Sequence, residues 1–230
     1  MSTNSLDKLQ NGIDKNLSWR KKELTNLKMV IDMSEGSVLL TLLRSGITLL
    51  YAHWEGFIKI SAREYLYYLN SLKLNCFDMT DNFLTLTLKP MIIDVRQSNK
   101  STSHYKVVDK ILNGQFSIFN VNVMEKLIID TESNLSYKVL EDILFNLGLD
   151  STQYQLKEHY IKNKLLDTRN KIAHGEFVPL IRKKNNIYEA ETEAKEDWNS
   201  LYKEILELME LFKKQILDAA QNEYYLKKNK

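Results

Sequence analysis

The chain has 230 residues, with 32 lysines and arginines against 30 aspartates and glutamates, and this near balance excludes a protein that draws nucleic acid through a strong overall positive field. Its single cysteine, Cys76, excludes an internal disulfide framework and favours a reducing compartment, the cytoplasm. Hydrophobic residues make up 43% of the chain, which predicts a globular protein with a core and excludes a disordered one.

The first part of the chain predicts two long helices. In residues 5–33 apolar side chains recur at intervals of three, four and seven, which indicates an amphipathic helix: Leu9, Ile13, Leu17, Leu24, Leu27 and Ile31. A second helix is predicted for residues 34–70, with Ser34 as its N-cap. Its most apolar stretch, residues 38–54, contains Arg44 and is too short for a membrane span, so it is expected to be buried in the protein.

Helical periodicity weakens between residues 77 and 125, where we expect an irregular insertion. Leu84, Leu86 and Leu88 alternate with threonines, which predicts short strands or extended loops. A helix near residues 104–112 is expected to interrupt this region.

Helical spacing returns in the second half of the chain, at residues 135–147 and 154–174. A connector with a turn at Asn185-Asn186 is predicted for residues 177–189. The last helix is predicted for residues 191–225, with one apolar stripe: Trp198, Leu201, Tyr202, Ile205, Leu208, Phe212, Ile216 and Ala219. The tail, residues 226–230, is expected to be disordered. No linker divides the chain, so we predict a single all-α domain over residues 1–230, a bundle of long antiparallel helices.

One stretch combines a phosphate-binding cation with a proton-transfer group, Arg169-Asn170-Lys171-Ile172-Ala173-His174 followed by Gly175. Arginine offers a planar set of donors that match phosphate oxygens, and histidine titrates near neutral pH. In an unbroken helix Arg169 and His174 would lie about 140° apart. Gly175 readily takes the left-handed conformation that ends helices, so His174 is expected at the last turn, from which it can bend toward Arg169.

A purely structural interpretation of the same residues remains open. Arg169 would then pair with Asp167 or a helix carbonyl, and His174 would only cap the helix. Four cations around the motif are expected to form an RNA-contacting patch: Lys162, Lys164, Arg169 and Lys171. A second group is expected to be ordinary solvated surface: Arg182, Lys183 and Lys184.

Residues 168–176 resemble the signature of the HEPN superfamily, in which an arginine and a polar residue precede a histidine after a short spacer. Residues 43–59 resemble the second helix of the MAE-type branch of HEPN-like nucleases, and residues 133–150 are similar to the same branch. The resemblance extends from about residue 35 to the end of the chain. It implies a helical bundle whose active site is built across a homodimer.

The chemistry expected of such a site is RNA cleavage without a metal or another cofactor. The ribose 2′-hydroxyl would attack the adjacent phosphorus, while His174 accepts its proton or protonates the leaving 5′-oxygen. Arg169 would stabilise the negative charge on the non-bridging oxygens. Asn170, on the same helical face as His174, would orient the imidazole or bind the phosphate. The products would be a 2′,3′-cyclic phosphate and a 5′-hydroxyl, and DNA would resist cleavage because it lacks the attacking group.

Glu55 follows His53 and Trp54 on a mostly apolar helix, so its carboxylate needs a partner. Arg169 is one candidate, which would make Glu55 a positioning residue for the catalytic arginine. The alternative partners would form a structural ion pair: Arg44, Lys59 and Arg63. His53 and Trp54 are expected to be packing residues.

The sequence therefore predicts a cytoplasmic, homodimeric endoribonuclease of a toxin–antitoxin or anti-phage defence system, with an antitoxin or defence protein as a further partner and no contact with a membrane. The alternative is a non-catalytic helical dimer that binds RNA or a protein partner. A third hypothesis is a metal-dependent DNA nuclease built from Asp94 with Glu193-Ala194-Lys195. No metal site is predicted, because the histidines are scattered without ligand spacing: His53, His104, His159 and His174.

Overall fold

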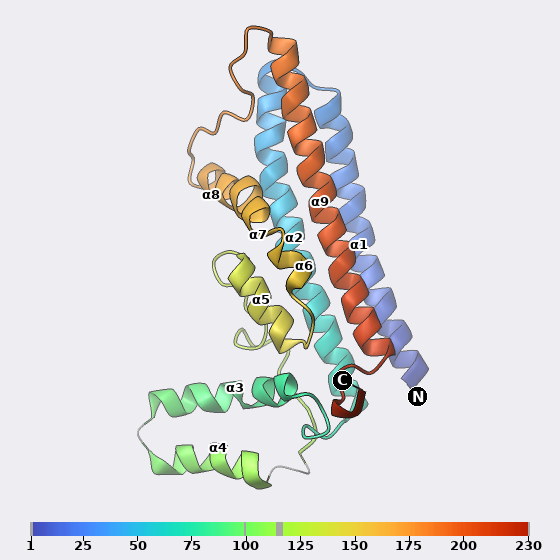
Figure 1. Ribbon diagram of the computed structural model, residues 1–230, viewed down its shortest axis with the longest axis vertical. Helices are drawn as coiled ribbons and strands as arrows, with labels where there is room; N and C mark the ends of the chain where they lie inside the picture. Colours follow the sequence, from blue (N-terminus) through green and yellow to red (C-terminus); the bar gives the residue numbers. More distant parts are fainter. Residues whose placement is uncertain (1, 99, 114–116, 230) are drawn as a thin grey trace.

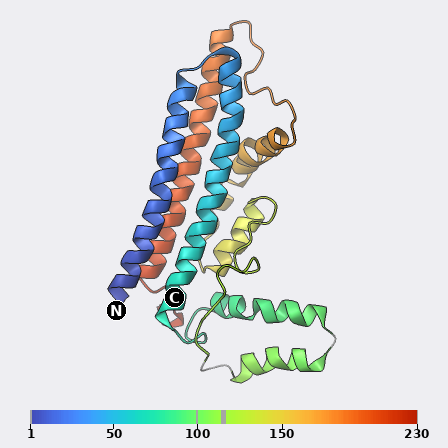
Figure 2. The ribbon, with the colours of Figure 1, turned by 180° about the vertical axis from the view of Figure 1, so that it is seen from behind.

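In the computed structural model, which describes residues 2–98, 100–113 and 117–229, three long helices form the frame (Figure 1). They are α1 (Ser2–Asp32), α2 (Gly36–Leu72) and α9 (Ile187–Gln221). α1 runs antiparallel to the other two, and the view from behind in Figure 2 shows all three side by side. The described residues form helices and no strand, so the all-α prediction is confirmed.

The three helices pack through the apolar stripes that the sequence predicted. In α1 the stripe is buried from Leu9 to Ile31, with Leu27 partly buried, and in α9 it is buried from Trp198 to Ala219 apart from the half-buried Tyr202. Side chains at this spacing line one helical face, so each helix removes that face from water. No helix among the described residues combines the length and the apolar content of a membrane span.

The junction between α1 and α2 differs from the prediction. Ser34 is not the N-cap of the second helix; its hydroxyl donates to the Val30 carbonyl at 2.7 Å and so belongs to the end of α1. The N-cap residue is Glu35. The first N–H of α2, from Gly36, donates to the carboxylate of Glu191 in α9 at 2.8 Å. A carboxylate is favourable there because the N-terminal end of a helix carries partial positive charge.

The predicted irregular insertion is wrong for most of its length. α3 (Asp81–Gln97) and α4 (Ser101–Asn113) form a helical hairpin that projects from the end of the bundle where α2 ends (Figure 1). The helix expected near residues 104–112 lies within α4. Residues 99 and 114–116, which also belong to the predicted insertion, lie outside the described residues.

The alternation of leucine and threonine predicted the two-residue repeat of a strand. This prediction is wrong because a threonine hydroxyl can donate to a backbone carbonyl within a helix. Thr87 donates its hydroxyl to the Phe83 carbonyl one turn earlier at 2.9 Å, and Thr85 bonds back in the same way. Phe83 and Leu86, three residues apart, are both fully buried. The buried spacing in α3 is therefore that of a helix.

The tail predicted to be disordered is ordered over residues 226–229. Leu226 is buried, and η3 (Lys227–Asn229) is one turn of 3₁₀-helix. The N–H of Lys227 donates to the Asp78 carbonyl, and its ammonium pairs with Asp81, both at 3.0 Å. These contacts fasten the tail to the start of α3. Residue 230 lies outside the described residues.

A series of short helices lies along one side of α2 and carries the motif (Figure 1). The helix predicted for residues 135–147 is present, and the one predicted for 154–174 is broken into turns. The elements are α5 (Tyr137–Asn146), α6 (Thr152–Gln155), α7 (Glu158–Tyr160), the π-helix η2 (Ile161–Leu166) and α8 (Asp167–Ala173).

The π-helical turn leads directly into the motif helix. The N–H of Asp167 donates to the carbonyl of Lys162, five residues earlier, as a π-turn requires. Ile161, Leu165 and Leu166 are buried and hold this wider turn against the core. Such turns occur often at functional sites, and this one sets where α8 begins.

Candidate functional site

Arg169, near the start of α8, is half-buried and meets neutral partners. Its Nη1 donates to the amide oxygens of Asn134 at 2.7 Å and Asn170 at 2.8 Å. Its Cζ lies 4.4 Å from the ring centre of Tyr51 in α2, a cation–π contact. Within the described residues no carboxylate forms an ion pair with Arg169, so the predicted pairing with Asp167 is absent there. The guanidinium keeps a positive charge that no neighbouring carboxylate neutralises.

Tyr51 supports Arg169 as a neutral ring. Burial, together with the nearby Glu55 carboxylate, raises the pKa of the Tyr51 phenol to about 12, against the opposing effects of the Leu135 N–H and the Arg169 charge. The phenol is therefore protonated at physiological pH and cannot neutralise the guanidinium. Its oxygen accepts a hydrogen bond from the N–H of Leu135 at 2.8 Å. Tyr51 thus fixes both the arginine and the loop that supplies Asn134.

Glu55 lies one turn after Tyr51 and has a partner that the sequence did not suggest. Its carboxylate accepts a hydrogen bond from the hydroxyl of Thr131 at 2.7 Å. In the described part of the chain it forms no ion pair with Arg169 or with the other cations considered as partners. Glu55 therefore reaches Arg169 indirectly, because it holds the loop that begins at Thr131 and carries Asn134.

His174 lies at the open end of α8. The helix ends at Ala173, and the backbone N–H of His174 donates to the Asn170 carbonyl at 3.0 Å. Gly175 follows with φ +80°, the left-handed conformation predicted for a glycine that ends a helix. The imidazole is exposed, and no partner for it is found among the described residues. It can therefore turn toward a ligand without first breaking a contact.

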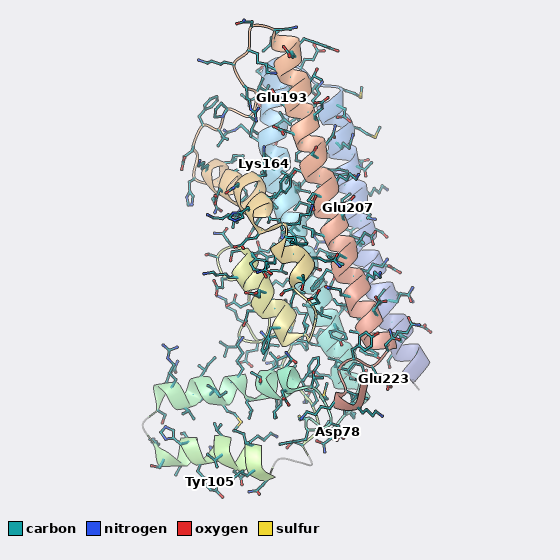
Figure 3. All side chains as sticks on the ribbon, in the orientation of Figure 1. Asp78, Tyr105, Lys164, Glu193, Glu207 and Glu223 are labelled. Carbon is teal, nitrogen blue, oxygen red and sulfur yellow. The ribbon has the colours of Figure 1, made fainter. Side chains whose placement is uncertain are left out.

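The two other residues of the predicted site have different surroundings. The side chain of Asn170 accepts from Arg169, so it orients the arginine and not the imidazole in this structure. Lys171, which follows Asn170 in the sequence, is exposed, and Lys162 of the same basic patch is exposed as well. Lys164, labelled in Figure 3, lies 3.7 Å from Asp197 of α9.

The connector after the motif is held at both ends by arginines. Arg44 of α2 donates to the Glu176 carbonyl at 3.0 Å, and its Cζ lies 5.9 Å from the ring centre of Phe177. At the other end Arg182 pairs with Glu193 of α9 at 2.8 Å. The group of cations predicted to be ordinary solvated surface is thus partly engaged in ion pairs that fix this segment.

The residues proposed for a metal-dependent nuclease are kept apart. Asp94 belongs to α3, which projects from one end of the molecule, whereas Glu193 lies near the start of α9 at the other end (Figure 3). Glu193 is paired with Arg182, and Lys195 donates to the Asp32 carbonyl at 3.0 Å. Among the described residues no three His, Cys, Asp or Glu side chains gather as metal ligands would.

Sequence reasoning missed the residues that hold Arg169 in place. Tyr51 and Asn134 hold Arg169, and Arg44 holds the start of the connector. All three lie in segments that resemble the MAE-type branch, and that resemblance was the available signal. The sequence alone could not pair them, because their contacts join α2, the loop before α5 and the motif. His53 and Trp54 are buried, as expected of packing residues.

Comparison with known proteins identifies the family. A family model described as RiboL-PSP-HEPN matches residues 15–218, a range that includes α2, the motif and most of α9. Neither the curated proteins nor the solved structures contain a significant match. The MAE-type branch stays a prediction, whereas the HEPN superfamily is supported over most of the chain. The chain belongs to the RiboL-PSP-HEPN family.

Proposed function

We propose that this chain is a metal-independent endoribonuclease that acts in the cytoplasm as a homodimer. One observation carries the proposal: the Arg169 guanidinium is held by two neutral amides and a neutral ring, with no carboxylate partner in the described residues. A cation that is fixed in place but not neutralised is suited to bind a phosphate whose charge increases during cleavage. Membership in a HEPN family supports a ribonuclease.

The proposed reaction uses the residues in separate roles. The 2′-hydroxyl oxygen attacks the adjacent phosphorus and loses its proton to an imidazole, and the bond to the 5′-oxygen breaks as that oxygen receives a proton. Arg169 binds the non-bridging oxygens throughout, using Nη2 and Nε, for which the described chain supplies no partner. Asn134, Asn170 and Tyr51 are positioning residues for Arg169. Lys171 adds positive charge to the surface that RNA would approach.

A dimer would supply the second proton-transfer group. Each chain offers a single histidine at the motif, whereas the reaction needs a base and an acid. A two-fold axis beside the open end of α8 would bring the partner's copy of the motif to the same phosphate. His174 and Phe177, three residues apart in the sequence, are both exposed, and an exposed apolar ring near the motif suits a subunit contact.

Exchanging subunits between the wild type and the His174→Ala variant tests this arrangement. A site at the two-fold axis that needs both imidazoles loses one of them in every mixed dimer, so the mixed dimers should be inactive. The cleavage rate should then fall with the square of the wild-type fraction. A rate that falls in direct proportion to that fraction, after verified subunit exchange, would contradict a shared site.

The proposed activity is tested by incubating the purified protein with structured and unstructured RNA in EDTA. We expect cleavage that leaves 2′,3′-cyclic phosphate ends, measured by mass spectrometry, and no cleavage of DNA of the same sequence. The His174→Ala variant should be inactive, and His159→Ala, which removes an exposed histidine away from the motif, should cleave normally. Cleavage by the His174→Ala variant, or activity on DNA with magnesium alone, would reject the proposal.

The alternative function is a non-catalytic dimer that binds RNA or a protein. It is favoured by one observation, the lack of any partner for the His174 imidazole among the described residues, since a catalytic histidine is commonly oriented by a second group. RNA binding without cleavage in the same experiment would support this alternative.

A place in toxin–antitoxin or anti-phage defence completes the proposal, with an antitoxin or another defence protein as the partner that restrains the enzyme. Expression of the chain alone should slow host growth. Arg169→Ala and His174→Ala should relieve the slowing, because both remove cleavage. Equal toxicity of the wild type and both variants would show that growth inhibition does not come from this site.

A further inference from the structure

A cavity of about 180 Å³ lies beside the motif, between α2, α8, the connector and α9. Much of its wall is apolar and comes from the two long helices: Leu43, Ile47, Trp198 and Leu201. Its charged residues are exposed and form a rim where the cavity meets solvent: Lys164, Arg182 and Asp197. Figure 3 labels Lys164 on the side of the molecule where α8 approaches α9.

The cavity and the arginine site share one face of α2. Leu43, Ile47 and Tyr51 follow one another at intervals of four, so they line the same side of the helix. Ile47 borders the cavity and Tyr51 supports Arg169, about 6 Å farther along the helix. Thr168 also borders the cavity and directly precedes Arg169. A group in the cavity would therefore lie next to a phosphate bound by Arg169.

The size of the cavity limits what can occupy it. Its volume is below the range of about 300–1,000 Å³ for sites of drug-sized ligands, and far above the space of a single bound water. A single planar ring system fits a cavity of about 180 Å³. A nucleobase has two apolar faces and a polar edge, which matches an apolar wall with a polar rim. Proteins that read single-stranded RNA take up unstacked bases in this way.

The charges at the rim can read the edge of a base. Asp197 lies 3.7 Å from both Lys164 and Arg182, too far for a hydrogen bond, so its carboxylate can still accept one. Arg182 is held in place by its closer contact with Glu193. One carboxylate between two cations complements guanine, which carries N–H donors beside the acceptors O6 and N7.

Trp198 borders the cavity and is almost fully buried. Its indole ring therefore lies where it can report what occupies the cavity.

We propose that this cavity binds an unpaired base of the RNA substrate next to the scissile phosphate, and that guanine is the base its rim fits best. The inference rests on the proposed ribonuclease function and adds a specificity subsite to it. The ion pairs of Asp197 at the rim are exposed and long, so an entering base displaces contacts of little energetic value.

The first test sequences the cleavage sites in an unstructured RNA pool of random sequence. The wild type should cut at a fixed distance from guanine, with a preference of about tenfold over other bases. Asp197→Asn should remove most of this preference. Glu196→Gln, a change of the same type at the neighbouring exposed position outside the cavity wall, should keep it. A wild type without base preference, or a preference that Asp197→Asn leaves intact, would overturn the subsite.

The second test does not depend on cleavage. The full chain is labelled with 5-fluorotryptophan, and the three ¹⁹F signals are assigned by exclusion with Trp19→Phe and Trp54→Phe. Guanosine 5′-monophosphate should shift the Trp198 signal and leave the half-exposed Trp19 signal unchanged. Asp197→Asn should weaken this binding, and Glu196→Gln should not.

The two tests separate this inference from the proposed function. If RNA is not cleaved but the nucleotide shifts the Trp198 signal, the ribonuclease proposal fails and base binding stands. If RNA is cleaved without base preference and no shift occurs, only the subsite fails. A preference for another base that Asp197→Asn removes would keep the subsite and reject guanine.

Discussion

An arginine and a histidine lie close together in sequence at the motif, and another arginine and histidine meet between α1 and α2. Between α1 and α2, Arg20 and His53 are both buried. Nη1 of Arg20 lies 3.2 Å from Nδ1 of His53 and also donates to the backbone carbonyl of His53 at 3.2 Å. At the motif Arg169 is half-buried and His174 is exposed. The residue types are the same, and their surroundings differ.

The buried pair is enclosed by further polar contacts. Arg20 donates from Nε to Asn16 at 3.0 Å, and Gly56 leaves room for its guanidinium, since a Cβ there would lie 3.0 Å from two of its nitrogens. Nε2 of His53 lies 2.7 Å from the Glu23 carboxylate, within ion-pair distance but not aligned as a hydrogen bond. These contacts join α1 to α2, so the cluster has a structural role.

The buried cluster and the motif differ in whether the arginine charge and the histidine imidazole are available to a ligand. The Arg20–His53 cluster is enclosed and has a carboxylate beside it, whereas Arg169 has neutral partners and His174 is open to solvent. A site that binds a phosphate needs charge that the protein leaves uncompensated. Exposure and pairing therefore indicate function better than the presence of an arginine and a histidine.

The largest expected effect is the loss of cleavage in His174→Ala. Removing a general acid or base should lower the cleavage rate about 100- to 10,000-fold. The melting temperature should not change, because the imidazole is exposed. His53→Ala should show the reverse, with a lower melting temperature and a normal rate per folded molecule. If His53→Ala abolished cleavage in folded protein, the two places would not have separate roles.

The next effect concerns stability. Arg20→Ala leaves the Nδ1 of His53 and the side chain of Asn16 without their buried donor. We expect the free energy of unfolding to fall by about 1–3 kcal/mol, measured by urea denaturation. Lys22→Ala removes an exposed cation two residues away and should change it little. Equal stability of the two variants would show that the buried cluster does not join α1 to α2.

A smaller effect is expected when Arg169 loses one positioning contact. Asn134→Ala removes one of the two amide oxygens that hold its Nη1. The arginine would keep its charge but sample more orientations, so the cleavage rate should fall by about tenfold with little change in RNA affinity. Ser133→Ala, at the exposed neighbouring position, is the control. An unchanged rate in Asn134→Ala would show that Asn170 and Tyr51 suffice to position the guanidinium.

The sequence predicted the long helices because their apolar stripes extend over many turns. It failed where a local pattern has two solutions: the leucines and threonines of α3 fit a strand by alternation, yet Thr85 and Thr87 bond back within a helix. It also failed at the tail, because the contact of Lys227 with Asp81 joins distant parts of the chain.

At the candidate site the sequence indicated Arg169, His174 and the left-handed Gly175, because these are neighbours in one motif. It could not indicate Asn134 or the true partner of Glu55, because both depend on how the loop from residue 131 to residue 135 meets α2. The sequence thus gives the groups proposed to react, and the structure adds the residues that position Arg169.

The smallest expected effect is a pH dependence that comes from the buried cluster. Burial lowers the pKa of His53, and the Arg20 charge lowers it further against the opposing effect of Glu23. On acidification the unfolded chain therefore takes up this proton before the folded protein does. The contribution of His53 to the free energy of unfolding is fully present above about pH 6.5, the pKa of an ordinary histidine. It falls as the pH decreases toward the lowered pKa of the folded protein, by at most about 1.4 kcal/mol per pH unit. His53→Asn keeps an acceptor for Arg20 without this titration and should lose less stability than the wild type between about pH 7.5 and about pH 5, measured by urea denaturation. His159→Asn changes an exposed histidine, so its stability should vary with pH as that of the wild type does. If the stability of His53→Asn also varied in this way, the buried imidazole would not be the group that resists protonation.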